Sequence, residues 1–316
     1  MLGSAALAWV LPFEVFLVAY AVLGPLHYLT QISWLHDRGF FTTGRFDWIP
    51  LALLAGVACL AVYTTKVPWS GATLTAAGAA VMMAWVPSRV VKLASVLVFA
   101  VIAVPLQSSA IVATFFVVLL TTVVHVYVFT GIFILAGSMK GRSRSGFRSF
   151  GVYLACGVGL LLAHPPAADY QIGPTTKANL QSFLTVIGAM TTLTPGKVDW
   201  DKVVAVGRFL AFAYTYHYLN WFSKTGIIGW HSMSRRRMAV IGVVYAISLG
   251  LYAYDYSIGL TALFFLSITH VFLEFPLDAR TIVDVARGLV RHRGLAPPSP
   301  KARPRVGRRQ ERVPAH

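Results

Sequence analysis

Long runs of apolar residues, separated by short polar segments, dominate this chain. A helix that crosses the hydrocarbon core of a bilayer needs about 20 mostly apolar residues. Because that core offers no water to backbone N–H and C=O groups, a run that spans it must form a helix. Nine runs fit this description, at 7–34, 48–64, 71–86, 91–107, 110–136, 150–163, 203–222, 239–255 and 258–276. The pattern predicts an all-α, polytopic integral membrane bundle of about nine transmembrane helices.

The composition supports a membrane protein. The chain is 57% hydrophobic and only 12% charged, whereas soluble domains carry about 25% charged residues. The net charge of +16 does not indicate nucleic acid, because ten of the 27 Lys and Arg residues lie at or after Arg280 and most others lie in short loops. Cys59 and Cys156 lie inside apolar runs and are interpreted as small buried hydrophobes, with no disulfide framework.

The placement of the basic residues predicts the orientation. With the N-terminus outside, 22 of the 27 Lys and Arg residues lie on the cytosolic side, as the positive-inside rule requires. No basic residue precedes Arg38, so the first apolar run is expected to be a retained span rather than a signal peptide. We expect an outside N-terminus, a cytosolic C-terminus and a location in a bacterial inner (plasma) membrane.

Three regions are predicted along the chain. Residues 1–278 form the transmembrane helical domain. Residues 279–290 form an amphipathic helix on the inner membrane surface. Residues 291–316 are Pro- and Arg-rich and form a disordered basic cytosolic tail. Each basic residue of the tail could add about 1 kcal/mol of attraction to anionic lipid headgroups.

One long loop, 165–201, is predicted on the outer side, and its apolar middle, 183–190, could be a re-entrant or interfacial helix. Glu14 is the single acid deep in the first run, and we favour a structural, hydrogen-bonded role for it over a place in a substrate path.

Four histidines, His27, His125, His217 and His270, lie in predicted spans that all run from outside to inside. A rise of about 1.5 Å per residue places all four roughly 10–22 Å above the cytosolic charges. Polar groups are costly in lipid and usually mark function there. Imidazole is a common neutral metal ligand that suits iron, zinc and copper. We therefore predict one metal bound by these four residues, Fe(II) first and Zn or Cu as alternatives. Interhelical hydrogen bonding, haem binding and a proton relay remain open.

Several neighbours of the histidines are candidates for supporting roles. Glu274 follows His270 by four residues and so shares its helix face; it is the candidate catalytic carboxylate, able to orient an imidazole or to act as a fifth ligand. Gln31 has the same relation to His27. His36 and His231 lie at the inner membrane edge and could be ligands or a lid, but we favour ordinary interfacial positions. Four aromatic residues are weaker candidates for lining a substrate tunnel: Tyr214, Tyr218, Trp221 and Phe272.

The sequence around these histidines resembles the Brp/Blh family of membrane β-carotene 15,15′-dioxygenases. The resemblance rests on four short motifs, about 60 residues in all: Gly24-Pro25-Leu26-His27, Val123-Val124-His125-Val126, Tyr214-Thr215-Tyr216-His217-Tyr218 and His270-Val271-Phe272-Leu273-Glu274. It implies a polytopic fold in which membrane histidines hold non-haem iron. The chain departs from the family where Leu26 interrupts the Gly-Pro-His order and where a single His217, with a distant His231, replaces a pair of histidines. The substrate is therefore not carried over.

The function predicted from the sequence is a membrane-embedded, histidine-coordinated non-haem iron oxidoreductase, an O2-dependent oxygenase. Its substrate would be lipophilic, such as an isoprenoid, a carotenoid or an acyl chain, and would enter from the bilayer. One alternative is a transporter or channel whose buried histidines and Glu274 form a proton or ion path. Another is a non-catalytic assembly factor whose basic tail binds partners or anionic lipid.

Overall fold

The structure is a computed structural model of the chain, and it describes residues 1–64, 69–162, 170–191, 199–229 and 233–293. Within these ranges every regular element is a helix and no strand occurs, which confirms the all-α fold class. The longer elements are α3 (Gly24–Asp37), α4 (Trp48–Thr64), α5 (Trp69–Trp85), α6 (Arg89–Leu106), α8 (Thr130–Lys140), α9 (Arg144–Leu162), α11 (Gln181–Thr191), α12 (Trp200–Phe222), α14 (Arg235–Tyr254) and α15 (Tyr256–Arg293). The remaining elements are α1 (Leu2–Val10), α2 (Pro12–Val18), the π-helix η1 (Ala19–Leu23), the 3-10 helix η2 (Gly39–Phe41), α7 (Ala110–Ala113), the π-helix η3 (Thr114–Phe129), α10 (Pro174–Asn179) and α13 (Thr225–Ile228).

The helices are apolar enough for a membrane protein. Six stretches of the described chain are long and apolar enough to cross a bilayer: Pro12–Asp37, Arg89–Leu106, Ile111–Lys140, Arg144–Leu162, Arg235–Tyr254 and Tyr256–Val290. A shorter apolar helix, Trp48–Thr64, has the bounds of the second predicted run. The two other predicted runs, 71–86 and 203–222, are occupied by α5 and α12.

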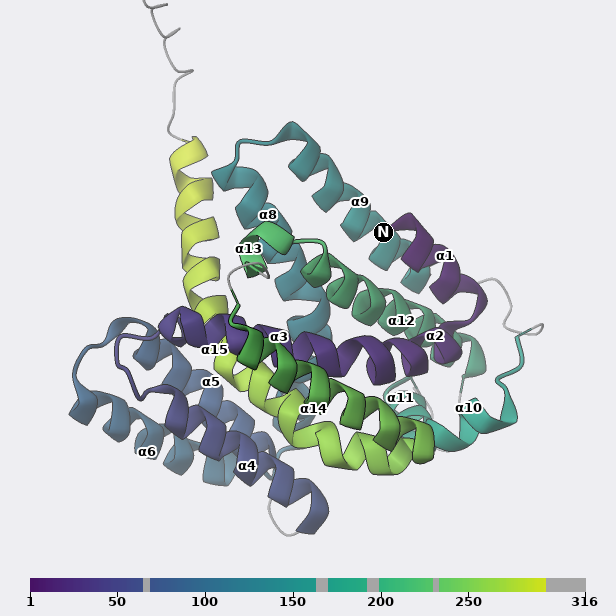
Figure 1. The fold of residues 1–316 in the computed structure, drawn as a ribbon, viewed down its shortest axis with the longest axis horizontal. Helices are drawn as coiled ribbons and strands as arrows, with labels where there is room; N and C mark the ends of the chain where they lie inside the picture. Colours follow the sequence, from purple (N-terminus) through teal and green to yellow (C-terminus); the bar gives the residue numbers. More distant parts are fainter. Residues whose placement is uncertain (65–68, 163–169, 192–198, 230–232, 294–316) are drawn as a thin grey trace, which may run out of the picture.

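The helices pack into two groups around a shared middle. On one side α4, α5 and α6 pack together, and on the other α12 packs on α1, α2 and α9 (Figure 1). Helix α15 touches α3, α4, α5, α8 and α14, so it connects the two groups. Each group has its own apolar core, one centred on α2 and α12 and the other on α4, α5 and α15.

A π-helical turn and a proline interrupt the first long helical stretch, Pro12–Asp37. Pro25 lies at the start of α3, directly after the five-residue π-helix η1. Proline has no N–H to donate to the preceding turn, and π-helical turns are a common way to re-route a helix at such a point, often near functional sites. The π-helical turn and Pro25 thus lie just before His27 in the chain.

Small residues allow the close helix crossings of this fold. A Cβ added to Gly78 of α5 would lie 2.5 Å from the Phe99 ring of α6, and one added to Gly207 of α12 would lie 2.7 Å from Phe13. Such distances leave no room for a larger side chain. In lipid, helices associate through this kind of packing because the hydrocarbon gives no hydrophobic drive between them.

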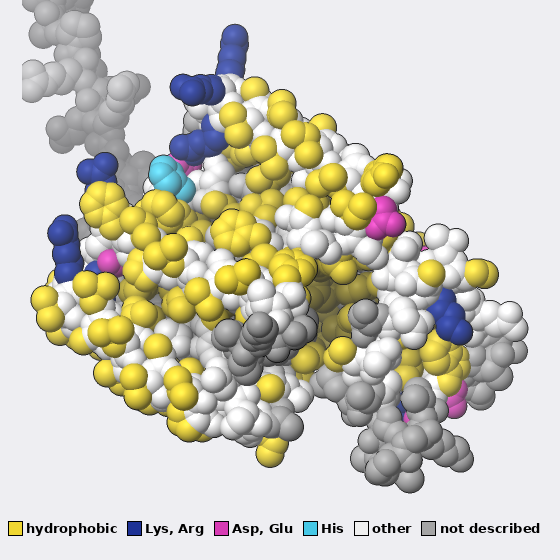
Figure 2. Space-filling view, turned by 90° about the horizontal axis from the view of Figure 1, so that it is seen from below, with side chains coloured by type: hydrophobic (Ala, Val, Ile, Leu, Met, Phe, Trp, Pro, Cys, Tyr) yellow, Lys and Arg dark blue, Asp and Glu magenta, His cyan; other side chains and the backbone are white. Residues whose placement is uncertain are grey.

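The surface is apolar over wide areas. Figure 2 shows one face covered mostly by hydrophobic side chains, with the Lys and Arg side chains gathered mainly at one end. On α6, Leu97 and Val101 are 68% and 71% exposed. Apolar patches of this extent mark contact with lipid or with other proteins, and the helix hydropathy indicates lipid.

Two predicted segments, 279–290 and 183–190, lie in the helices α15 and α11. The predicted separate helix at 279–290 is the continuous end of α15, which runs through Pro276 to Arg293; its position on a membrane surface stays a prediction. The apolar segment 183–190 lies in α11, where the Phe183 ring stacks on Phe16 at 4.6 Å between centroids. Residues 294–316, which make up most of the predicted tail, lie outside the described residues.

Candidate functional site

Four helical segments bring four histidines together at the centre of the fold. His27 comes from α3, His125 from η3, His217 from α12 and His270 from α15. All four are buried, the most exposed being His217 at 8%. Their rings form a closed circle in which neighbouring centroids are 4.6 to 5.4 Å apart: His27–His217, His217–His125, His125–His270 and His270–His27. The convergence expected from the matching depths in the sequence is therefore present.

The ring nitrogens face one another in two pairs. Nε2 of His217 lies 3.0 Å from Nε2 of His27, and Nε2 of His125 lies 3.2 Å from Nε2 of His270. A neutral imidazole nitrogen either donates or accepts, so each pair either shares one hydrogen bond or faces a cation. Two ligands bound at about 2.0–2.1 Å to one metal are themselves roughly 3.0–3.4 Å apart. Both pairs have that spacing.

The four nitrogens do not yet form a complete coordination sphere. Among the described residues, no group of three or more His, Cys, Asp or Glu side chains has the arrangement of a metal site. The donor types suit a transition metal, and the spacing within each pair suits shared coordination. The two pairs would have to draw together for all four nitrogens to reach one ion.

The outer nitrogens of the rings differ in their partners. Nδ1 of His217 lies 2.7 Å from Oγ1 of Thr130. Nδ1 of His27, His125 and His270 has no hydrogen-bond partner in the described part of the chain. A ligand histidine usually has its second nitrogen fixed by a neighbour, and only His217 has such a hydrogen bond here.

Glu274 approaches a histidine of another helix. Its Oε2 lies 3.6 Å from Nδ1 of His125, a separation beyond an ordinary hydrogen bond, and the carboxyl group is 4% exposed. Glu274 shares a face of α15 with His270, as the sequence predicted, and this brings it to the cluster. The imidazole nearest to its carboxyl group is, however, that of His125 on η3. Gln31 is 1% exposed and neighbours this carboxyl group rather than orienting His27.

Three residues that sequence reasoning missed also belong to the site. Thr130 holds His217, and Tyr28 stacks on the His270 ring at 4.3 Å with an interplanar angle of 23°. Asp278, one turn after Glu274, is 2% exposed, and neither of its carboxyl oxygens has a hydrogen-bond partner among the described residues. The i, i+4 spacing of Glu274 and Asp278 was the available signal, since it places both carboxyl groups on one face.

The candidate tunnel residues have different surroundings. Trp221 lines a cavity of about 200 Å³ beside the histidines, and its Nε1 donates to Oγ1 of Thr30 at 3.0 Å. Tyr214, Tyr218 and Phe272 are buried in the apolar cores. The Tyr218 hydroxyl lies 2.9 Å from the hydroxyl of Tyr28, and Tyr28 stacks on His270, so Tyr218 contacts the histidines' neighbour.

The remaining polar candidates lie elsewhere. The His36 side chain is 65% exposed, with Nδ1 3.6 Å from the Asp37 carboxylate, which agrees with the interfacial position favoured for it. His231 lies outside the described residues. Glu14 accepts a 2.7 Å hydrogen bond from the Tyr170 hydroxyl and one from the backbone N–H of Gly173, which fits the structural role expected for it.

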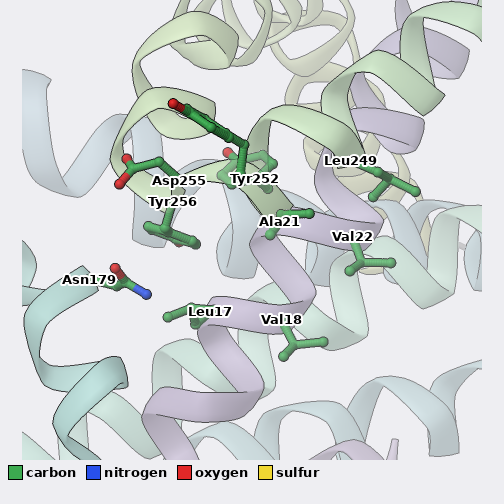
Figure 3. A pocket seen from close by; sticks show the side chains of 11 residues that line it. Leu17, Val18, Ala21, Val22, Asn179, Leu249, Tyr252, Asp255 and Tyr256 are labelled. Carbon is green, nitrogen blue, oxygen red and sulfur yellow. The ribbon is translucent and has the colours of Figure 1, made fainter.

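A larger cavity, of about 570 Å³, lies apart from the histidines. Figure 3 shows Leu17 and Val18 of α2 together with Tyr252 and Tyr256 among the residues that line it. Asp255 is the only acidic lining residue among those that the structure describes, and none of the four buried histidines lines it. Its size alone does not make it the functional site.

Over the described residues, the fold and the histidine cluster define an all-helical protein with helices long and apolar enough to cross a membrane and with a buried polar centre. A comparison of the chain with protein-family models, with known proteins and with solved structures found no match in any of the three. The function is therefore argued from the site alone.

Proposed function

We propose that His27, His125, His217 and His270 bind one transition metal and that the protein is an O2-dependent non-haem iron oxygenase acting on a lipophilic substrate. The observation that carries the proposal is the meeting of four imidazoles from four helical segments, with their Nε2 atoms facing in pairs 3.0 and 3.2 Å apart. Burying four polar imidazoles costs free energy, and no acid or hydroxyl group lies between their paired nitrogens. Such a cluster is expected to serve a function.

The metal is Fe(II), with zinc and copper as alternatives. Imidazole suits all three metals, so the preference for iron rests on the resemblance of the four histidine motifs to the Brp/Blh dioxygenases. Iron would supply the activation of O2 beside the substrate. Thr130 would fix the His217 ring, and Glu274 would orient His125 or act as a further ligand.

The proposed substrate is apolar because of where the site lies. In the proposed topology, nine helices span a bacterial inner membrane, the N-terminus lies outside and the basic tail is cytosolic. The placement of the basic residues supports it. The cavity beside the histidines is lined by Trp34, Phe133 and Leu277 as well as by polar groups, so it can hold an apolar chain against the site.

One observation favours a second function, a proton or ion path. Glu274 and Asp278 are buried carboxyl groups one turn apart, with oxygens that have no hydrogen-bond partner among the described residues. Ionisable groups placed in this way within a membrane often carry protons or ions. The alternative predicts a flux across liposomes that responds to pH and falls in a His270→Ala variant.

Metal analysis of the purified protein tests the leading proposal. We expect about one equivalent of iron per chain in the native protein and less than about a tenth in His125→Ala, because four protein ligands are needed for tight binding. His36→Ala is the matched control, since that side chain is exposed and away from the cluster. Iron, zinc and copper contents that are all below a tenth of an equivalent in the native protein would overturn it.

A further inference from the structure

Two cavities adjoin at the end of the histidine site that is predicted to be cytosolic. The cavity of about 200 Å³ reaches His27, His217 and Glu274, and a groove of about 550 Å³ lies between α8 and α15. Both are lined by the same four residues: Trp34, Phe133, Gly137 and Leu277. The groove and the inner cavity therefore border each other at these four residues, and at Gly137 the space beside the backbone is open.

The two cavities differ in polarity. The groove is walled mainly by apolar residues such as Ala136, Met139 and Val285, with Lys140 and Asp284 also in its lining. The inner cavity adds amide, ammonium, imidazole and hydroxyl groups and the carboxyl group of Glu274 to its apolar wall. This contrast fits an amphiphile whose polar end lies in the inner cavity and whose chain lies in the groove.

Lys224 gives the inner cavity a positive charge. It lines the cavity together with Asn220, which lies in the last turn of α12. In the described part of the chain no carboxylate lies within ion-pair distance of Lys224. Burial lowers the pKa of its ammonium group, which reflects a charge partly removed from water without a counter-ion.

We propose that this combined cavity binds a single-chain lipid with an anionic head, such as a long-chain carboxylate, with the head against Lys224 and Asn220 and the chain between α8 and α15. This inference rests on the proposed function, because it identifies the lipophilic substrate of that same site. Lys224 follows His217 by seven residues, just beyond the end of α12 at Phe222, and lines the same cavity as His217. The carbons that lie near the histidines are therefore those within reach of the head group.

Gly137 keeps the passage between the two cavities open. It lines both, and a Cβ added to it would meet no atom within 4 Å. A large side chain at this position fits the helix and fills the junction. Gly242 of α14 also has no atom within 4 Å of an added Cβ but lines neither cavity, so it provides a matched control.

The test uses the full-length protein in lipid nanodiscs. The probe is palmitic acid carrying a mid-chain diazirine and a terminal alkyne, cross-linked by light and located by mass spectrometry. We expect labelling in α8 and α15 that unlabelled palmitic acid competes better than hexadecanol does. Gly137→Trp should lower this labelling about tenfold or more while Gly242→Trp leaves it unchanged, and Lys224→Met should remove the preference for the acid, also about tenfold. Lys202→Met, a lysine of α12 that is paired with Asp199 and lines neither cavity, is the control for loss of charge.

Iron content, measured on the same samples, separates this inference from the proposed function. Gly137→Trp and Lys224→Met should keep their metal while losing the probe, and His125→Ala should lose metal while keeping the probe. Labelling that Gly137→Trp does not reduce, or that palmitic acid and hexadecanol compete equally, overturns the inference whatever the metal content. Selective labelling of a protein without metal upholds the lipid site and refutes only the iron proposal.

Discussion

The hydroxyl of Thr130 lies 2.7 Å from Nδ1 of His217, and this is the hydrogen bond that fixes the outer nitrogen of one of the four clustered imidazoles. With Nδ1 protonated and donating to Thr130, Nε2 of His217 is left as a lone-pair donor that faces His27. Metal binding through Nε2 requires this tautomer, in which Thr130 accepts from Nδ1.

Replacing Thr130 by Val tests this relationship. The variant keeps the shape of the side chain and loses the oxygen, so we expect metal affinity to fall about 10–100-fold. Thr130→Ser should retain most of the affinity because it keeps the hydroxyl. Competition with a chelator measures the change, and equal affinities for the Val and Ser variants would contradict the assigned role.

Glu274→Gln should separate metal binding from stability. The buried carboxyl group has one oxygen without a hydrogen-bond partner among the described residues, so a neutral amide of the same size should not lower the melting temperature of the metal-free protein. Metal affinity should fall about tenfold. Glu14→Gln is the control, because Glu14 bonds to Tyr170 and not to the cluster. A loss of stability without a loss of affinity would show that Glu274 has a structural role alone.

A buried ion pair away from the site should be important for stability. Nζ of Lys92 lies 2.5 Å from Oδ2 of Asp47, and both residues are buried. Lys92→Met leaves the carboxylate buried and unpaired, which should cost about 3–5 kcal/mol. The double variant Lys92→Met with Asp47→Asn should recover much of that loss. Unfolding of the native protein and the two variants in mixed micelles gives the comparison, and a double variant no more stable than Lys92→Met would argue against the pairing.

The start of α12 should respond to acid. Asp199 caps this helix by accepting from the backbone N–H of Lys202, and a hydrogen bond from the Lys202 side chain lowers the pKa of its carboxyl group. A carboxyl group with a lowered pKa stabilises the fold above its ordinary pKa, and that contribution disappears as the pH falls through the lowered value. Asp199→Ala should therefore reduce stability at neutral pH and leave it unchanged at strongly acidic pH. An equal loss at both pH values would exclude a contribution from the charge.

Much of the helical content was predictable from local pattern. The run at 48–64 became α4 with the same bounds, because an apolar run bounded by polar residues needs no distant partner to form a helix. The run at 110–136 was less regular than its pattern suggested, since 16 of its residues form the π-helix η3. A hydropathy pattern cannot distinguish an α-helix, in which each N–H bonds to the carbonyl four residues earlier, from a π-helix, in which it bonds to the carbonyl five residues earlier. The π-helical turn matters at the site, where His125 and Thr130, five residues apart, both face His217.

The sequence by itself determined that apolar helices dominate the chain and that four of them carry a histidine at a similar depth, because helix length and rise are local properties. Only the tertiary structure decided which nitrogens face one another, that Glu274 approaches His125 rather than His270, and that Asp278 is buried. The reason is rotational: a residue pattern fixes which side chains share one face of a helix, but packing against neighbouring helices sets the direction in which that face points.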